Sequence, residues 1–178
     1  MRLSGSRARQ SGKLGALADI LNEYKRKFLV VIDEGKEADR AITFAAHRVK
    51  RTGGTVVLLS VIDNADFTQF LGVEDVMRAE AREEAERLLD AKRARIDQIS
   101  SGVRTETVIR EGDLVNEIEN LIRQDPGIAI LVLAASAGKD GPGPLVSAFA
   151  SRAGQLALPV IVTIIPGAMT DEQIVAVT

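Results

Sequence analysis

The stretch that decides the fold runs from Ile128 to Ile165. It reads IAILVLAA (128–135), SAGKDGPGP (136–144), LVSAFASRAGQLAL (145–158) and PVIVTII (159–165). Its first run is apolar without alternation, which is typical of a strand buried on both faces of a parallel sheet. We therefore predict a strand, a glycine-rich loop, a helix and a second strand, in that order.

The predicted loop contains Gly138, Gly141 and Gly143. Glycine lets the backbone turn sharply and approach a ligand where a side chain would block it. The next helix, predicted to begin near Leu145, presents unpaired N–H groups and the positive end of its dipole, which favour an anion such as phosphate. The loop is therefore a candidate phosphate site, and a plain connection between a strand and a helix is the alternative.

The chain before this stretch repeats the same alternation. Because five predicted strands alternate with four predicted helices, we expect an α/β fold with a single doubly wound parallel sheet, right-handed crossovers and helices on both faces. The predicted strands are 28–32, 55–62, 103–110, 128–134 and 159–165, and the helices between them are 38–49, 74–99, 114–122 and 145–158.

Ligands of doubly wound sheets bind outside the carboxyl ends of the strands, where the strand order reverses. Asp33 follows the first predicted strand, and the loop Ser136–Pro144 follows the fourth. If these two strands are central neighbours, Asp33 and the loop meet in one crevice.

Composition excludes several classes of function. The 178 residues have a formal net charge of -2, which gives no electrostatic reason for binding nucleic acid or an anionic membrane. The chain has no Cys and one His, His47, so disulfides, thiolate metal sites and most His-based catalysis are excluded. No apolar run reaches about 18 residues and no secretory signal is present, so we expect a cytoplasmic protein.

We divide the chain into three segments. Residues 1–26 form an extension, disordered at first and then a short amphipathic helix. Residues 27–166 form the domain, and residues 167–178 form a tail with a short helix that starts at Thr170.

The last predicted strand, Pro159–Ile165, lies at an edge of the sheet but is apolar on both faces. An exposed apolar edge pairs with another strand unless it is covered, so we expect a homodimer through this strand. The alternative is that the extension or the tail folds over the edge within one chain.

In their order and spacing, four fragments of the chain resemble the universal stress protein family. They are VVIDEG (30–35), GGTVVLLSVID (53–63), REGDLVNEIENLI (110–122) and ILVLAASAGKDGPGPLVSAF (130–149). The resemblance implies an adenine-nucleotide alpha-hydrolase-like sheet in the order 3-2-1-4-5, a homodimer and, in one subgroup, an ATP or AMP site.

That subgroup carries the motif G-x-x-G, nine residues, then G-[ST]. Here Ala135 stands at the first glycine, Gly138 matches the second, and Val146 replaces the third glycine before Ser147. The spacer is also about two residues short. A valine at the third position would obstruct the close approach that glycine permits.

The resemblance also implies which residues contact a ligand. Asp33 matches the nucleotide-contacting acid of the family, and Val61 matches its apolar contact beside adenine. We expect ATP or AMP as the ligand, Mg²⁺ only when ATP is bound, no metal held by the protein alone and no catalytic residue. The expected cofactor-binding residues are Asp33, Val61, Ala135, Ser136, Gly138, Lys139 and Ser147.

Two functions stay open on the sequence. One is a dimeric stress-response or regulatory protein whose loop is only structural. The other is a nucleotide-binding sensor or slow ATPase that uses Asp33, Val61, Gly138 and Ser147. A redox or transfer enzyme is disfavoured because no G-x-G-x-x-G follows the first strand.

Overall fold

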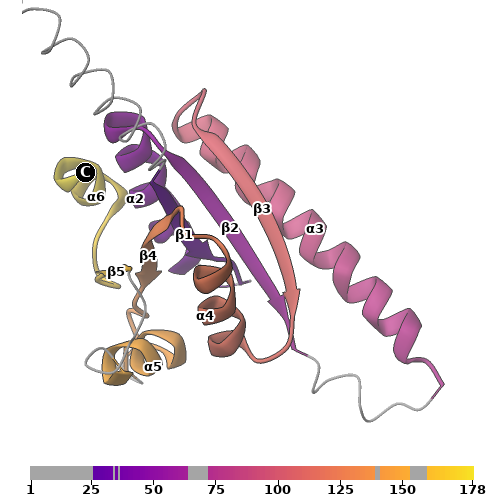
Figure 1. Ribbon diagram of the computed structural model, residues 1–178. Coiled ribbons are helices and arrows are strands. Elements are labelled where there is room, and N and C mark those ends of the chain that lie inside the picture. Colours follow the sequence, from indigo (N-terminus) through magenta and orange to yellow (C-terminus); the bar gives the residue numbers. More distant parts are fainter. Residues whose placement is uncertain (1–25, 34, 36, 64–71, 139–140, 153–159) are drawn as a thin grey trace, which may run out of the picture.

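The computed structural model describes residues 26–33, 35, 37–63, 72–138, 141–152 and 160–178, in which a parallel sheet lies between two layers of helices (Figure 1). The strands are β1 (Lys27–Val31), β2 (Thr55–Ile62), β3 (Arg104–Glu111), β4 (Ile128–Ala134) and β5 (Ile161–Ile165). The helices are α2 (Glu37–Thr52), α3 (Glu74–Ile99), α4 (Leu114–Gln124), α5 (Pro144–Arg152) and α6 (Asp171–Val177).

The five strands are parallel and lie in the order β3-β2-β1-β4-β5, which confirms the predicted fold. β1 is the central strand, with β2 on one side and β4 on the other. After β3 the chain crosses from one half of the sheet to the other, so the strand order reverses between β1 and β4.

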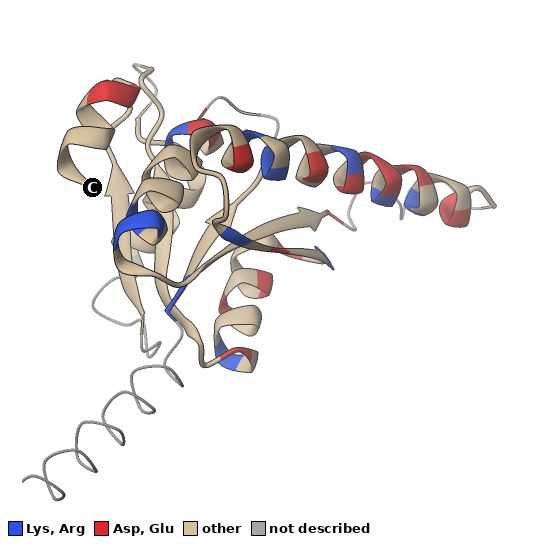
Figure 2. Cartoon of the chain, turned by 90° about the horizontal axis from the view of Figure 1, so that it is seen from above, with Lys and Arg blue, Asp and Glu red and all other residues tan. Residues whose placement is uncertain are grey.

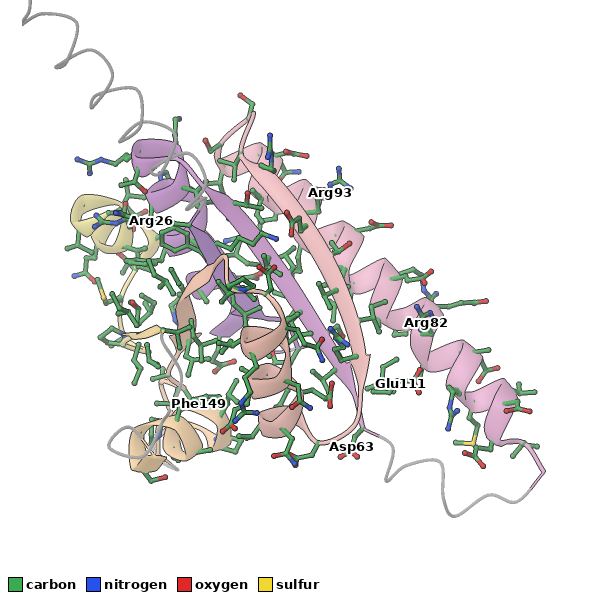
Figure 3. The ribbon with its side chains drawn as sticks, in the orientation of Figure 1. Arg26, Asp63, Arg82, Arg93, Glu111 and Phe149 are labelled. Carbon is green, nitrogen blue, oxygen red and sulfur yellow. The ribbon has the colours of Figure 1, made fainter. Side chains whose placement is uncertain are left out.

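The core has two parts because the sheet is covered on both faces. On one face, Phe28 and Val30 of β1 pack with α2, α3 and α6. On the other face, Leu29 of β1 packs with α4 and α5, including the buried Phe149 (Figure 3). Adjacent residues of the inner strands therefore enter opposite halves of the core, which explains their unbroken apolar sequences.

The edge strand β3 alternates, as its sequence predicts. Val103, just before the strand, and Ile109 pack on the α2 and α3 face, whereas Val108 packs on the other face. At the carboxyl end of β3, Glu111 forms ion pairs with Arg78 and Arg82 of α3. Figure 3 shows Glu111 on β3 and Arg82 on α3. These pairs attach the long helix α3 to the edge of the sheet.

Helix α3 extends past the sheet and carries charges of both signs (Figure 2). Pairs such as Arg78 with Glu74 connect residues four apart on its exposed surface. Its buried residues are Ala85, Leu89 and Ile96. The charge runs of α3 are therefore an exposed helix surface, as the sequence indicates.

Lys27 joins separate elements at the amino end of the sheet. Its Nζ lies 2.6 Å from Glu106 Oε2 on β3 and 2.8 Å from Asp125 Oδ2, which follows α4. Burial alone would lower the pKa of Lys27, but the hydrogen bonds and charges of Asp125 and Glu106 outweigh burial and raise it. The stabilisation is present below the ordinary pKa of lysine and is lost as the pH rises through the raised pKa.

The tail helix expected after Thr170 is present as α6. The Thr170 side chain accepts a hydrogen bond from Gln173 N–H, and the Gln173 side chain accepts one from Thr170 N–H. The expected helix of the extension and most of the stretch between β2 and α3 lie outside the described residues. No described helix is both long and apolar enough to cross a membrane.

Truncating the central core should destabilise the fold strongly. Leu131 on β4 is 0% exposed. We expect Leu131→Ala to lower the free energy of unfolding by about 2–5 kcal/mol, because it removes buried methyl groups and leaves a cavity. Urea unfolding followed by circular dichroism measures the change.

The matched control is Val76→Ala on α3, where the side chain is 60% exposed. This substitution should change the free energy of unfolding by less than about 0.5 kcal/mol. Equal effects of the two substitutions would contradict the placement of the core.

Candidate functional site

A pocket of about 320 Å³ opens at the carboxyl ends of β1 and β4, where the strand order reverses. This size lies at the lower end of the range for small-molecule sites, about 300–1,000 Å³. The lining residues are Val31, Asp33, Glu37, Ala38, Ala41, Leu114, Val132, Leu133, Ala134, Ser136, Pro142, Gly143, Pro144, Leu145 and Val146.

The pocket is mainly apolar because strand ends and helix sides form its walls. Val31 and Val132 come from β1 and β4, and Leu145 comes from α5. Ala38 and Ala41 come from α2, and their small side chains leave space beside the sheet. Such walls suit a flat apolar group, with polar contacts at the rim.

The described polar rim is acidic. Asp33 follows β1, and its Oδ1 accepts a hydrogen bond of 2.9 Å from the Gly35 N–H. Glu37 begins α2. A Cβ atom on Gly35 would lie 2.9 Å from Asp33 Oδ1 and 2.8 Å from Glu37 Oε2, so a side chain at this position would displace the flexible ends of the two carboxylates.

The charge of this rim limits the ligand. Among the described lining residues, Asp33 and Glu37 are acidic and none is Lys or Arg. Carboxylates only accept hydrogen bonds when they are ionised. The rim therefore favours ligand groups that donate, such as sugar hydroxyls, over bare phosphate.

The loop after β4 is closed by its own backbone. The Ser136 N–H donates to the Pro142 carbonyl over 3.0 Å, and the Gly138 N–H lies 3.4 Å from Ser136 Oγ. Gly141 and Gly143 have φ values of 97° and 96°, which favour glycine. The described part of the loop is thus a tight turn that brings Ser136 and Pro142 together at the pocket.

The loop offers few N–H donors for an anion. Pro142 and Pro144 have no N–H group. The Ser147 N–H donates to the Gly143 carbonyl over 3.0 Å inside the first turn of α5. Of the first helical residues, Leu145 and Val146 retain N–H groups with no partner within the helix. A phosphate would therefore find fewer donors here than in a loop without prolines.

Two of the expected site residues line the pocket, Asp33 and Ser136. Ala135 lies just behind it: its N–H donates to the Ile165 carbonyl over 2.8 Å, and its carbonyl accepts from Arg40 Nη2 over 3.1 Å. The structure therefore places Ala135 as an anchor of the loop.

The other expected residues do not line the pocket or are not described. Gly138 and Ser147 are exposed and absent from the lining, and Val61 packs in the core cluster below α4 and α5. Lys139 lies outside the described residues. Val146, at the motif's third glycine, is 5% exposed and packs with Phe149.

Sequence reasoning missed several lining residues. Glu37 and Leu114 begin helices that follow β1 and β3, so their position after a strand was an available signal. Leu114 reaches the pocket because Asp113 fixes the start of α4 by accepting a hydrogen bond from Asn116 N–H. Val146 was noted only as an obstruction, whereas it is part of the wall.

Comparisons with known proteins agree with the fold. A family model described as the universal stress protein family matches residues 25–156. The universal stress protein UspA from Lactobacillus plantarum has 24% identity and a TM-score of 0.64, over 79% of this chain and 97% of that chain. Among curated proteins, none matches significantly.

Further solved structures share the fold. The hypothetical protein MJ0577 has 17% identity and a TM-score of 0.67, over 83% of this chain and 99% of that chain. A universal stress protein in complex with cAMP has 14% identity and a TM-score of 0.57, over 81% of this chain and 98% of that chain.

The turn at Gly143 should be sensitive to any side chain. A Cβ atom there would meet nothing within 4 Å, so a substitution acts through φ alone. We expect Gly143→Ala to lower the free energy of unfolding by about 1–2 kcal/mol. Gly143→Asn should cost less, because asparagine tolerates positive φ better. Equal stability of all three proteins in urea would contradict the described turn.

Proposed function

The chain belongs to the universal stress protein family, and we propose that it is a regulatory stress-response protein that binds an adenine nucleotide between Asp33 and Ser136. The observation that carries the proposal is the pocket at the reversal between β1 and β4, where doubly wound sheets bind ligands. One protein of the same fold forms a complex with cAMP, which is itself an adenine nucleotide.

The chemistry of the lining residues suits the adenosine part of the ligand. The apolar walls formed by Val31, Val132 and Leu145 suit the faces of the adenine ring. The Asp33 carboxylate lines the pocket, and in this proposal it accepts hydrogen bonds from the ribose hydroxyls. Ser136, which also lines the pocket, supplies a hydroxyl that both donates and accepts hydrogen bonds.

The phosphates contribute little affinity in this proposal. Pro142 and Pro144 remove donors from the loop, and the carboxylates of Asp33 and Glu37 repel negative charge. If ATP binds with Mg²⁺, Asp33 and Glu37 would be the residues that hold the ion, and its charge would offset their repulsion of the phosphates. AMP and ATP are both ligands, and adenosine is the part that is recognised.

We propose a sensor rather than an ATPase. Phosphoryl transfer requires positive groups where charge develops in the transition state. The described lining residues provide no Lys, Arg or His for this purpose. Any hydrolysis of ATP is therefore weak, and the bound nucleotide acts as a signal.

A comparison of ligands tests the proposal. Because the site recognises adenosine, we expect the dissociation constants of adenosine, AMP and ATP with Mg²⁺ to agree within about tenfold, which corresponds to about 1.4 kcal/mol. Isothermal titration calorimetry measures them. ATP binding a hundredfold more tightly than adenosine would show a phosphate site instead, and no binding at millimolar ligand would leave a regulatory protein without nucleotide.

Substitution at the rim tests the role of Asp33. Asp33→Ala should weaken all three ligands to a similar degree, by roughly tenfold to a hundredfold, because a hydrogen bond to a charged group is lost. The matched control is Asp97→Ala, an exposed acid on α3. Equal affinity of the Asp33 variant and the control would contradict the proposed ribose contact.

We also propose that the protein is a homodimer through β5. In the single chain, Ile161 and Ile164 of this edge strand are 67% and 39% exposed. The tail does not remove this exposure, because α6 packs against α2. Pairing of β5 with the same strand of a second copy would satisfy its free backbone groups and cover both side chains.

A charge on the edge should separate the two copies. Ile161→Lys places a charge in the proposed interface, so we expect a monomer at micromolar concentration, as measured by size exclusion with light scattering. Val177→Lys on α6 is the matched control, since Val177 is 63% exposed elsewhere. A wild-type monomer under the same conditions would rule out the dimer.

A further inference from the structure

The loop after β4 is held by three residues that do not line the pocket, Arg40, Ile165 and Gly167. Ala135 is bonded through its N–H to the end of β5 and through its carbonyl to Arg40 of α2. The next two residues, Ser136 and Ala137, contact the backbone of Gly167. Gly167, in the segment that follows β5, therefore packs directly against the loop.

The contact at Gly167 leaves no room for a side chain. A Cβ atom on Gly167 would lie 2.6 Å from Ser136 C, Ser136 O and Ala137 N, which are all backbone atoms. The φ of Gly167 lies outside the positive range, so the contact, and not strain in its own backbone, requires glycine here. A side chain on Gly167, or a shift of this turn toward the loop, must therefore move Ser136 or Ala137.

The same turn leads directly into α6. Met169 N–H donates to the Pro166 carbonyl over 3.1 Å, and Thr170 then caps the start of the helix. α6 has 7 residues, and isolated helices of this length are not stable in water. The helix therefore depends on its contacts with the rest of the protein.

Contacts with α2 and α3 hold α6 in place. Ile174 is 0% exposed in the core cluster that includes α2. Asp171 Oδ2 lies 3.6 Å from Arg95 Nη2 of α3, and Arg48 Nη1 of α2 donates to the Thr178 carbonyl over 3.2 Å. The buried side chains of Ile174 and Thr178, together with these polar contacts, hold α6 in place.

We propose that the segment Pro166–Thr178 is a clamp that positions Ser136 in the pocket, so that docking of α6 and binding of the adenine nucleotide are coupled. This inference rests on the proposed function and adds its regulation. Gly167 and Ile174 are positioning residues, since neither lines the pocket.

The coupling follows from the hydrogen bonds of the loop. Ser136 lines the pocket and is bonded to Pro142 on the other side of the turn, so both move together. When α6 leaves its site, the support at Gly167 is lost and the loop gains conformational freedom. Ligand binding must then order the loop again, which lowers the affinity. By linkage, bound nucleotide must favour the docked helix by the same factor.

The test measures AMP affinity of the full chain with substitutions outside the pocket. We expect Gly167→Ala and Ile174→Asp each to raise the dissociation constant of AMP at least about fivefold, at the lower end of typical coupling. Ala168→Ser adds one atom at the exposed neighbour of Gly167, and Val175→Asp adds a charge on the exposed side of α6. Both controls should stay within about twofold of the wild type.

Hydrogen exchange gives a readout that a merely structural role would not move. Saturating AMP should slow amide exchange in Asp171–Val177 of the wild type, although these residues do not touch the pocket. If Ile174→Asp fails to fold by circular dichroism, Gly167→Ala and its control carry the test. AMP affinity in Gly167→Ala equal to the wild type would overturn the clamp while leaving the nucleotide site intact.

A wild type that does not bind AMP would instead refute the proposed function. The clamp is then tested by hydrogen exchange of the ligand-free variants. Faster exchange of the Ser136 N–H in Gly167→Ala than in Ala168→Ser would support the clamp, because this N–H reports closure of the loop onto Pro142. Equal exchange in the two variants would overturn it.

Discussion

The parallel pairing of β1 with β4 is the interaction on which the pocket depends. β1 has β2 on its other side, so the chain crosses the sheet after β3 and the connections run in opposite directions from this point. α2, which follows β1, therefore covers one face, and α5, which follows β4, covers the other. The two strand ends leave a space that neither helix fills, and Asp33 and Ser136 lie at its rim.

Most of the fold could be predicted because a strand that is buried on both faces has an almost unbroken apolar sequence. Ile128–Ala134 and Thr55–Ile62 are almost wholly apolar, since polar alternation would place polar groups in the core. The site was less predictable. Asp33 and Ser136 follow strands and line the pocket, whereas Gly138 and Ser147, which were expected from a spaced motif, do not line it. The position of Leu114 after β3 was a signal, but only the packing of α4 shows that Leu114 lines this pocket.

The lining of the pocket explains how an incomplete phosphate-binding glycine motif is compatible with a nucleotide site. Val146 replaces a glycine of the motif and is buried in the wall, and prolines on both sides of Gly143 remove donors. These changes affect the phosphate end of a ligand, whereas the apolar walls and Asp33 remain for adenosine. Gly167, in the segment after β5, contacts the backbone of Ser136 in the same loop. Ser136 therefore connects the pocket with the segment that leads into α6.

The most direct test is a crystal structure of the full chain grown with AMP. The account predicts adenine between the apolar walls at the ends of β1 and β4, with a ribose hydroxyl within hydrogen-bonding distance of the Asp33 carboxylate. It also predicts Ser136 on the opposite side and the phosphate near the open rim. AMP at another place on the protein, or bound here with its phosphate against the Leu145 and Val146 N–H groups and its ribose away from Asp33, would contradict the account.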